Sequence, residues 1–284
     1  MQICRSKAET RAAIDRMRAG GAGSVGFVPT MGALHDGHLA LMRRARAEND
    51  RVVASVFVNP MQFNDPADLE KYPRDDARDL ALLEAEGVDA VFLPSVAEMY
   101  PAGAETVVEV TGLGNVLVGK LRPGHFRGVT TVVTKLFNIV RPDRAYFGEK
   151  DYQQLAIIRT MVRDLDMPVE IVGHPIVREA CGLAMSSRNV RLTAAHRAEA
   201  QVLARALDWA GARLAEAPAT AEDLAAGIRR ILATSPAAEV EAVDIQDARS
   251  LADLTGPLVA PLVILLAVRF GDVLLIDARE ATPA

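Results

Sequence analysis

The sequence has few cysteines, no long unbroken apolar run and no strong excess of one charge. Cys4 and Cys181 stand far apart and form neither a metal-ligand pattern nor a disulfide framework, as is usual in a reducing cytosol. The longest apolar run, residues 258–268, is interrupted by Pro261. It is too short to span a bilayer and predicts a buried strand. Because the N-terminus also lacks an apolar signal core, we expect a cytoplasmic protein with no membrane partner.

The formal net charge is −5, and acidic and basic residues are interspersed along the chain. No basic stripe of the kind that binds nucleic acid is present, so we expect no nucleic-acid partner. A local positive pocket for a small phosphate ligand is compatible with this balance. With 284 residues, 50% of them hydrophobic, the chain can bury a large core as one large domain or two medium ones.

Up to about residue 176, short apolar runs alternate with segments of helical periodicity. The predicted strands are residues 25–29, 52–58, 88–93, 145–147 and 169–172. The predicted helices are residues 6–19, 37–50, 75–86, 129–140 and 151–165. This alternation predicts an α/β fold with a Rossmann-like, doubly wound parallel sheet covered on both faces. Such sheets bind ligands beyond the carboxyl ends of their strands, where the strand order reverses.

The pattern changes after about residue 177. Two alanine-rich amphipathic helices are predicted at residues 193–216 and 221–232, and strands at residues 240–245, 262–268 and 273–276. Gly271-Asp272 between the last two strands indicates a hairpin. We therefore predict a Rossmann-like domain over residues 1–176 and a smaller α+β domain over residues 177–284.

The first motif is Pro-Thr-Met-Gly-Ala-Leu-His-Asp-Gly-His at residues 29–38, between a predicted strand and a predicted helix. Helix N-termini present free N–H groups and suit phosphates. His35 and His38 can project towards one ligand, and Gly37 lets a nucleotide approach the backbone. The His-x-Gly-His pattern resembles the signature of the HIGH superfamily of nucleotidyltransferases and class I aminoacyl-tRNA synthetases. Two surface histidines near a turn are the alternative interpretation.

The second motif is Leu-Ala-Met-Ser-Ser-Arg-Asn at residues 183–189. The hydroxyls of Ser186 and Ser187 and the guanidinium of Arg188 can grip a triphosphate tail. The segment resembles the KMSKS-type loop of the same superfamily. A solvated loop or a helix cap explains the motif equally well when it is taken alone.

The third motif is Phe-Gly-Glu-Lys-Asp-Tyr-Gln-Gln at residues 147–154, again after a predicted strand. Lys150 can neutralise an α-phosphate, Asp151 can accept a ribose hydroxyl, and Gln154 lies one helical turn from Lys150. The alternative is a solvated helix N-terminus capped by Asp151.

The fourth motif is Val-Asn-Pro-Met-Gln-Phe at residues 58–63. Asn59 and Gln62 are uncharged hydrogen-bonding groups just beyond a predicted strand. They suit a small substrate with hydroxyl and carboxylate groups. A turn built by Asn-Pro is the alternative.

Taken in order, the segments PTMGALHDGH, NPMQF, YPR, RPGHFRGV, FGEKDYQQ and GLAMSSRN resemble those of the pantothenate synthetase family. The similarity runs from about Ile3 into the C-terminal domain and thins after Leu192. A tRNA synthetase would also need an RNA-binding domain, for which this chain has no room.

The resemblance implies an ATP-dependent condensation of pantoate with β-alanine through an enzyme-bound pantoyl adenylate. AMP and pyrophosphate are released, and the product leads to coenzyme A. It implies a homodimer, and Mg²⁺ held mainly by the ATP phosphates with no protein metal site. The implied catalytic residues are His35, His38, Lys150 and Arg188. The implied ATP-binding residues are Met31, Gly37, His38, Gly148, Lys150, Asp151, Val177, Met185, Ser186, Ser187 and Arg188. The implied pantoate-binding residues are Asn59, Gln62 and Gln154.

Some positions have only a weak implied role, and others depart from the family pattern. Arg122 and His125 would support the site, and Asp75 and Asp76 would lie near its acidic positions. The departures are Cys181 for the common aspartate, Val190-Arg191 for Arg-Tyr, and Asn64 for glycine. They affect loop geometry and leave every proposed catalytic side chain in place.

Two other functions fit part of the sequence. Another small HIGH-type nucleotidyltransferase shares the first motif but does not explain NPMQF together with FGEKDYQQ. A non-catalytic ATP-binding module would bind ATP without pantoate-dependent release of pyrophosphate.

Overall fold

The computed structural model describes residues 1–21 and 23–283, and it divides the chain into two compact units. The first unit comprises Met1–Gly148 and Gln153–His174. The second comprises Glu149–Tyr152 and Pro175–Ala284. Among the described residues, we find no helix with the length and apolar character needed to cross a membrane.

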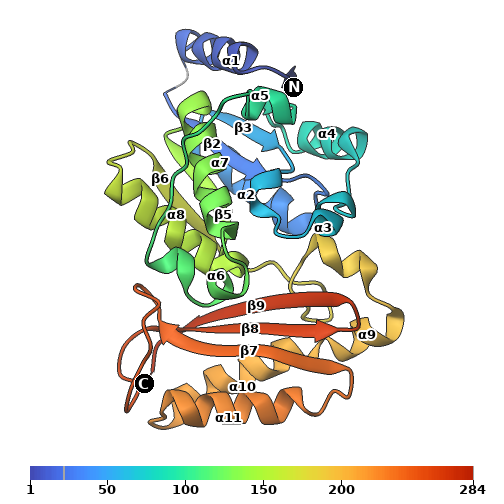
Figure 1. The fold of residues 1–284 in the computed structure, drawn as a ribbon, viewed down its shortest axis with the longest axis vertical. Coiled ribbons are helices and arrows are strands. Elements are labelled where there is room, and N and C mark those ends of the chain that lie inside the picture. The colour runs from blue at the N-terminus through green and yellow to red at the C-terminus, as the bar shows by residue number, and fades with distance from the viewer. Residues whose placement is uncertain (22, 284) are drawn as a thin grey trace. The chain divides into compact units, whose positions relative to one another are not determined.

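A six-stranded parallel sheet forms the centre of the first unit (Figure 1). Its strand order is β1-β4-β3-β2-β5-β6. The strands are β1 (Gln2–Cys4), β2 (Val25–Thr30), β3 (Arg51–Val56), β4 (Ala90–Phe92), β5 (Arg144–Gly148) and β6 (Glu170–His174). Because β2, β3 and β4 step one way across the sheet and β5 and β6 the other, the order reverses between β2 and β5. The predicted α/β class and parallel sheet are confirmed.

The pairing of β2 with its two neighbours is unequal. β2 pairs with β3 over its whole length, from Val25↔Arg51 to Thr30↔Val56. It pairs with β5 only at Gly26↔Arg144 and Phe27↔Ala145. The carboxyl halves of β2 and β5 therefore separate at the point where the strand order reverses. That is the position at which open α/β sheets bind their ligands.

Two apolar clusters cover the two faces of this sheet because successive strand residues point to opposite sides. Phe27 belongs to one cluster and its neighbour Val28 to the other. Side chains of α1 (Lys7–Ala19), α7 (His125–Val140) and α8 (Tyr152–Asp164) join the Phe27 cluster. Those of α2 (Asp36–Glu48) and α4 (Asp76–Ala85) join the Val28 cluster. The helices therefore hold the ends of the strands in fixed positions.

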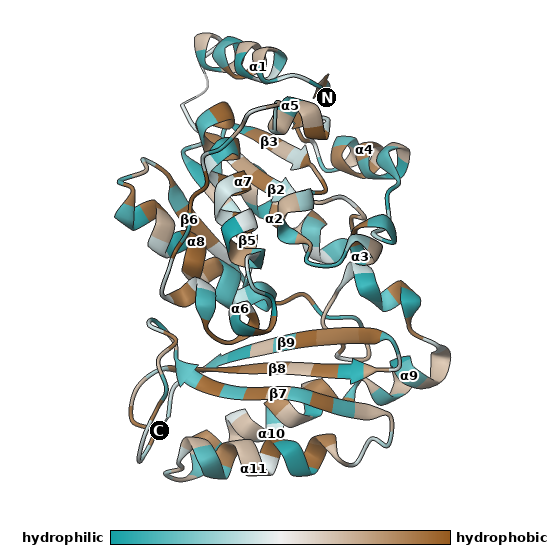
Figure 2. Ribbon diagram, viewed as in Figure 1, coloured by the Kyte–Doolittle hydropathy of each residue, from teal (hydrophilic) through white to brown (hydrophobic). Residues whose placement is uncertain are grey.

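The second unit contains an antiparallel sheet in the order β7-β8-β9. Its strands are β7 (Ala238–Asp247), β8 (Leu262–Phe270) and β9 (Val273–Ala281), and the last two form the predicted hairpin at Gly271-Asp272. Helices α10 (Val202–Glu216) and α11 (Ala221–Leu232) cover one face, as Figure 1 shows, and their side chains share one apolar core with the strands. Figure 2 shows the apolar character of β8 and the mixed surfaces of the two helices.

The helices of the second unit differ from the prediction in one place. The single helix expected over residues 193–216 is two helices, α9 (Ala194–Glu199) and α10. Leu203 N donates to Ala200 O at 3.2 Å, a tighter turn than the i→i−4 bonding of an α-helix, and it separates the two. Further along, Gly227 of α11 lets Trp209 of α10 approach, since a Cβ at position 227 would lie 1.8 Å from a Trp209 ring atom.

Candidate functional site

The loop after β2 is shaped by backbone in the left-handed region and held by a buried carboxylate. Gly32 and Ala33 have φ angles of 79° and 51°. The carboxylate of Asp79, on α4, accepts hydrogen bonds from Ala33 N at 2.8 Å and from Leu34 N at 2.9 Å. The Asp79 side chain is only 1% exposed. Asp79 therefore anchors the segment that leads to the histidine pair.

Asp79 is a site residue that the sequence reasoning missed. It pointed instead to Asp75 and Asp76, which stand at the start of the same helix. Asp75 caps α4 by accepting a hydrogen bond from Arg78 N at 3.0 Å. A carboxylate at the fifth residue of the helix predicted over residues 75–86, on its apolar side, was the available signal, because such a residue is buried only when it has partners.

The two histidines of the first motif form the N-terminal cap of α2. His35 is the N-cap residue, and its Nδ1 accepts a hydrogen bond from Gly37 N at 3.2 Å. Nδ1 of His38 accepts from His35 N at 3.4 Å, and the ring centroids are 4.1 Å apart. A ring nitrogen that accepts carries no proton, so Nε2 is the nitrogen of each ring that is left to carry one. The pair thus has the polarity needed to donate to phosphate oxygens at a helix N-terminus.

Three of the predicted substrate-binding residues lie together beyond β2 and β3. Asn59 caps the short 3₁₀ helix η1 (Pro60–Gln62), and its Nδ2 donates to Gln62 Oε1 at 3.1 Å. Gln62 Nε2 donates to the sulfur of Met31 at 2.9 Å. Asn59 and Gln62 are both buried. The structure therefore brings Met31, Asn59 and Gln62 into one hydrogen-bonded group.

The start of α7 packs directly on η1. His125 Nδ1 lies 2.7 Å from the Gln62 carbonyl, which can only accept, so that nitrogen carries a proton. Arg122 also donates to this carbonyl, at 3.3 Å. A Cβ at Gly128 would lie 2.4 Å from the carbonyl oxygen of Met61. The RPGHFRGV segment thus has a physical role, since it allows close backbone contact and fixes the position of Gln62.

The first turn of α8 places two adjacent glutamines in different environments. Gln153 is buried, and its amide is occupied by Leu113 O at 2.9 Å, Val116 O at 2.8 Å and Val118 N at 3.1 Å. Gln154 is half-buried. Gln153 is therefore structural, and the role of Gln154 in binding a ligand stays a prediction.

In the second unit, residues 177–185 fold back on themselves just before the SSRN segment. Met185 N donates to Val177 O at 2.9 Å. Arg178 donates two hydrogen bonds to Asp277 of β9, at 2.7 and 2.9 Å, and one to Gly182 O at 3.0 Å. The side chain of Asp277 is 1% exposed. This bidentate pair ties the segment of residues 177–185 to the sheet.

The SSRN segment forms a short 3₁₀ helix, η4 (Ser187–Arg191). Ser186 is its N-cap and accepts a hydrogen bond from Arg188 N at 3.3 Å. The helix-cap interpretation of the second motif therefore holds for Ser186. Lys150 and Asp151 lie in another short 3₁₀ helix, η3 (Glu149–Asp151), of the same unit.

Two of the departures from the family pattern, Cys181 and Val190, lie at the surface of this part of the chain. Cys181 is exposed, with its sulfur 3.7 Å from Glu179 Oε2, and Val190 is 79% exposed. Glu179 also accepts hydrogen bonds from Arg197 and Asn189. Burial acts to raise the pKa of Glu179, but the Arg197 and Asn189 bonds outweigh burial, and the pKa lies below its ordinary value. Cys181 thus lies beside a charged anchor, Glu179.

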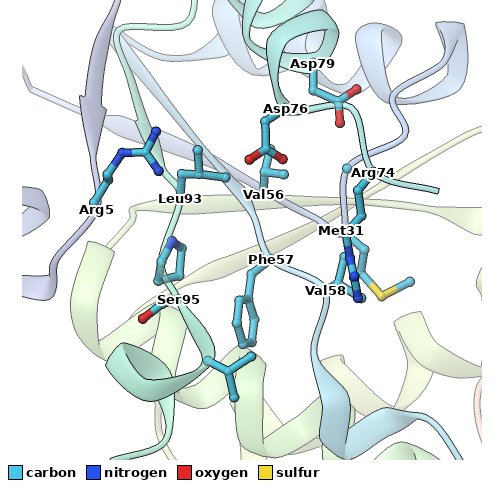
Figure 3. Close-up of a pocket in the computed structure, with 13 residues that line it drawn as sticks. Arg5, Met31, Val56, Phe57, Val58, Arg74, Asp76, Asp79, Leu93 and Ser95 are labelled. Atoms are coloured by element: carbon cyan, nitrogen blue, oxygen red, sulfur yellow. The ribbon is translucent and has the colours of Figure 1, made fainter. Parts of the chain in front are cut away.

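A cavity of about 370 Å³ lies in the first unit at the carboxyl ends of β2, β3 and β4 (Figure 3). Met31 and Gly32 line it on the side of the first motif. Charged side chains of both signs also line the cavity, namely those of Arg5, Arg74 and Asp76. The cavity thus lies beyond the carboxyl ends of the strands, but on the β3 and β4 side of β2 and not at the reversal between β2 and β5.

A doubly wound parallel sheet with a histidine-capped helix at the reversal of strand order defines an α/β enzyme fold of the nucleotide-binding type. A family model described as pantoate-beta-alanine ligase matches residues 2–280. The chain belongs to the pantoate–β-alanine ligase family, and it is a ligase of pantothenate biosynthesis. The resemblance drawn from the sequence is confirmed.

Individual relatives agree with this family. The chain is 53% identical to the pantothenate synthetase of Sinorhizobium medicae, covering 100% of this chain and 97% of that one. Identity to the Bartonella tribocorum pantothenate synthetase is 52%, covering 98% and 96%. The crystal structure of the Thermus thermophilus pantothenate synthetase has a TM-score of 0.91 at 48% identity, covering 100% of both chains. The Francisella tularensis pantoate–β-alanine ligase, complexed with β-γ ATP and β-alanine, has a TM-score of 0.80 at 35% identity, covering 98% and 97%.

Proposed function

We propose that this enzyme adenylates pantoate with ATP and then transfers the pantoyl group to the amine of β-alanine, releasing pyrophosphate and AMP. The observation that carries the proposal is the histidine-capped start of α2, in the same unit as the amide group of Asn59 and Gln62. A phosphate-binding helix terminus and uncharged donors for a small acid are the two requirements of an acid-adenylating site. The relative solved with an ATP compound and β-alanine supports the choice of substrates.

The chemistry needs positioning and charge stabilisation more than it needs a protein nucleophile. A free carboxylate is a poor acyl donor, and a mixed anhydride with AMP supplies a good leaving group. The pantoate carboxylate itself attacks the α-phosphorus, and pyrophosphate leaves. The protein holds the reactants in line and donates hydrogen bonds to the phosphate charge. The Nε2–H groups of His35 and His38 suit this task.

The remaining roles follow from the family resemblance. Gln62 and Gln154 hold pantoate, with Asn59 in the same group. Lys150 contacts the α-phosphate, and Ser186, Ser187 and Arg188 grip the β- and γ-phosphates. The ribose and adenine contacts are Gly148, Asp151 and the backbone of Val177 and Met185, while the backbone of Met31 and Gly37 borders the reacting groups.

Mg²⁺ is part of the proposal as an ion that arrives on the ATP phosphates and neutralises their charge. Within residues 1–21 and 23–283, no group of three or more His, Cys, Asp or Glu side chains is placed to hold a metal. A homodimer and a cytoplasmic location complete the proposal. Sedimentation of the purified chain tests the first, and fractionation of the cells that produce it tests the second.

A coupled assay for AMP, with ATP, pantoate and β-alanine omitted in turn, tests the reaction. Pyrophosphate release that needs ATP and pantoate, and AMP release that also needs β-alanine, supports the proposal. A product that keeps the nucleotide indicates another nucleotidyltransferase. ATP binding without pyrophosphate release indicates a non-catalytic module.

Variants of the histidine pair separate its chemical role from its capping role. His35→Asn keeps an N-cap acceptor, because asparagine is among the best N-cap residues, but it removes Nε2. We expect His35→Asn and Lys150→Ala each to lower adenylation by about 10²-fold or more, with the melting temperature of His35→Asn unchanged. Wild-type rates in both variants would show that these residues do not stabilise the transition state.

A further inference from the structure

The side chain of Asn59 has no hydrogen-bonding position left for a substrate. Its Nδ2 donates to Gly128 O at 3.0 Å and to Gln62 Oε1 at 3.1 Å. Its Oδ1 accepts from the hydroxyl of Tyr100 at 2.9 Å and from Met61 N at 3.3 Å. A side-chain amide has two N–H donors and two lone pairs, so all four positions are occupied. Asn59 is also only 1% exposed, and its role is therefore to hold its neighbours.

These contacts determine which way the Gln62 amide points. The Gly128 carbonyl can only accept, so the Asn59 atom beside it is the NH₂ group. The second hydrogen of that group is directed at Gln62, whose oxygen must therefore face Asn59. The Gln62 NH₂ group is left on the opposite side, where it contacts the thioether sulfur of Met31, a weak acceptor. A substrate oxygen is a stronger acceptor and can replace that contact.

Tyr100 supplies the donor at the far end of this chain of bonds. It follows the short helix α5 (Val96–Met99), and its ring packs against Phe57 with centroids 6.2 Å apart. Lys135 Nζ lies 5.4 Å from the centre of the ring. Burial raises the pKa of Tyr100 to about 12, so the hydroxyl keeps its proton throughout the neutral range. Asn59 Oδ1 therefore always faces a donor.

We propose that Tyr100 and Asn59 are positioning residues that fix the Gln62 amide as a hydrogen-bond donor towards the substrate. The pair makes the site selective for an oxygen with free lone pairs, such as a carboxylate or an accepting hydroxyl, at the position that Gln62 contacts. A group that can only donate, such as an ammonium group, meets another donor there and is rejected. This inference rests on the proposed function, in which Gln62 binds pantoate.

Isosteric variants test the polarity of this chain. Gln62→Glu presents an acceptor in place of the NH₂ group, and we expect the KM for pantoate to rise by about 10²-fold. Asn59→Asp removes the donor that orients Gln62, with an expected rise of similar size. Tyr100→Phe removes one of two donors to Asn59 Oδ1, with an expected rise of about 10-fold. The KM for ATP should stay within about 2-fold in all three variants.

Tyr146→Phe is the matched control for Tyr100→Phe. The hydroxyl of Tyr146 is also bonded to a buried asparagine, accepting from Asn49 Nδ2 at 2.6 Å, but this pair lies elsewhere in the sheet. Its loss should lower the melting temperature without changing the KM for pantoate. An equal rise of KM in both variants would show a general loss of packing and would overturn the inference.

A double-mutant cycle makes the test independent of folding effects. If Tyr100 acts only through Gln62, Tyr100→Phe raises the KM for pantoate in the wild-type background and has no further effect in a Gln62→Ala background. The same rise in both backgrounds refutes the proposed chain of action. Pantoate-dependent turnover with an unchanged KM in Tyr100→Phe overturns this inference alone. Wild-type protein without pantoate-dependent pyrophosphate release overturns the proposed function as well.

Discussion

Asp79 offers a direct test of how the loop before the histidine pair is held. In Asp79→Asn, one of two carboxylate oxygens becomes an NH₂ group that faces a backbone N–H. One charge-assisted bond, to Ala33 N or to Leu34 N, is lost, and a buried donor is left without its acceptor. The free energy of unfolding should fall by about 2–3 kcal/mol. Without this anchor, the backbone of Gly32 and Ala33 is held less firmly in its left-handed conformation. The histidine pair is then less well positioned, so kcat/KM should fall by about 10- to 100-fold.

Urea unfolding and the pyrophosphate assay measure the two effects. Asp75→Asn is the matched control, because Asp75 is the N-cap of the same helix and its carboxylate accepts from Arg78 N. Asparagine caps as well as aspartate does, so Asp75→Asn should change stability by less than about 0.5 kcal/mol and leave turnover intact. If Asp79→Asn behaves like Asp75→Asn in both assays, the carboxylate does not anchor the loop and the reasoning is wrong.

Three further substitutions have definite expected outcomes. Gly128→Ala should raise the KM for pantoate at least about 10-fold, because the added methyl displaces the backbone before Gln62; an unchanged KM refutes the close contact. Gly227→Ala should cost about 1–3 kcal/mol in urea unfolding, and less in a Trp209→Leu background. The pKa of Glu179 is lowered in the fold, so its stabilising effect is complete above its ordinary value of 4.5 and is lost as the pH falls through the lower folded pKa. The stability difference between wild type and Glu179→Gln should therefore shrink below about pH 4.5.

The sequence predicted the parallel sheet well because buried strands are apolar on both faces, as in the run at residues 52–58. It missed β1, since three residues carry too little periodicity to recognise. The separate helix α9 was also missed, because the break at Ala200 depends on one i→i−3 hydrogen bond and leaves no mark in composition.

Candidate site residues could be proposed from the sequence where a side chain of suitable chemistry follows a strand, as for His35 and Gln62, and their roles stay predictions. It was not predictable where function depends on a partner far along the chain. Asp79 binds backbone N–H groups 45 and 46 residues away, which have no side-chain signature. Tyr100 reaches Asn59 across 41 residues in the same way. Motifs therefore indicated the groups that we propose to face substrate and not the groups that hold them.

The two cysteines differ enough in exposure to allow labelling without mutagenesis. Cys4 is 0% exposed, and burial, followed by the nearby charge of Glu9, raises the pKa of its thiol, so it stays protonated and shielded. Cys181 is exposed and lies five residues before Ser186. A maleimide dye or spin label should react selectively with Cys181 in the native chain. Spectroscopy could then follow the SSRN segment in real time as nucleotide is added.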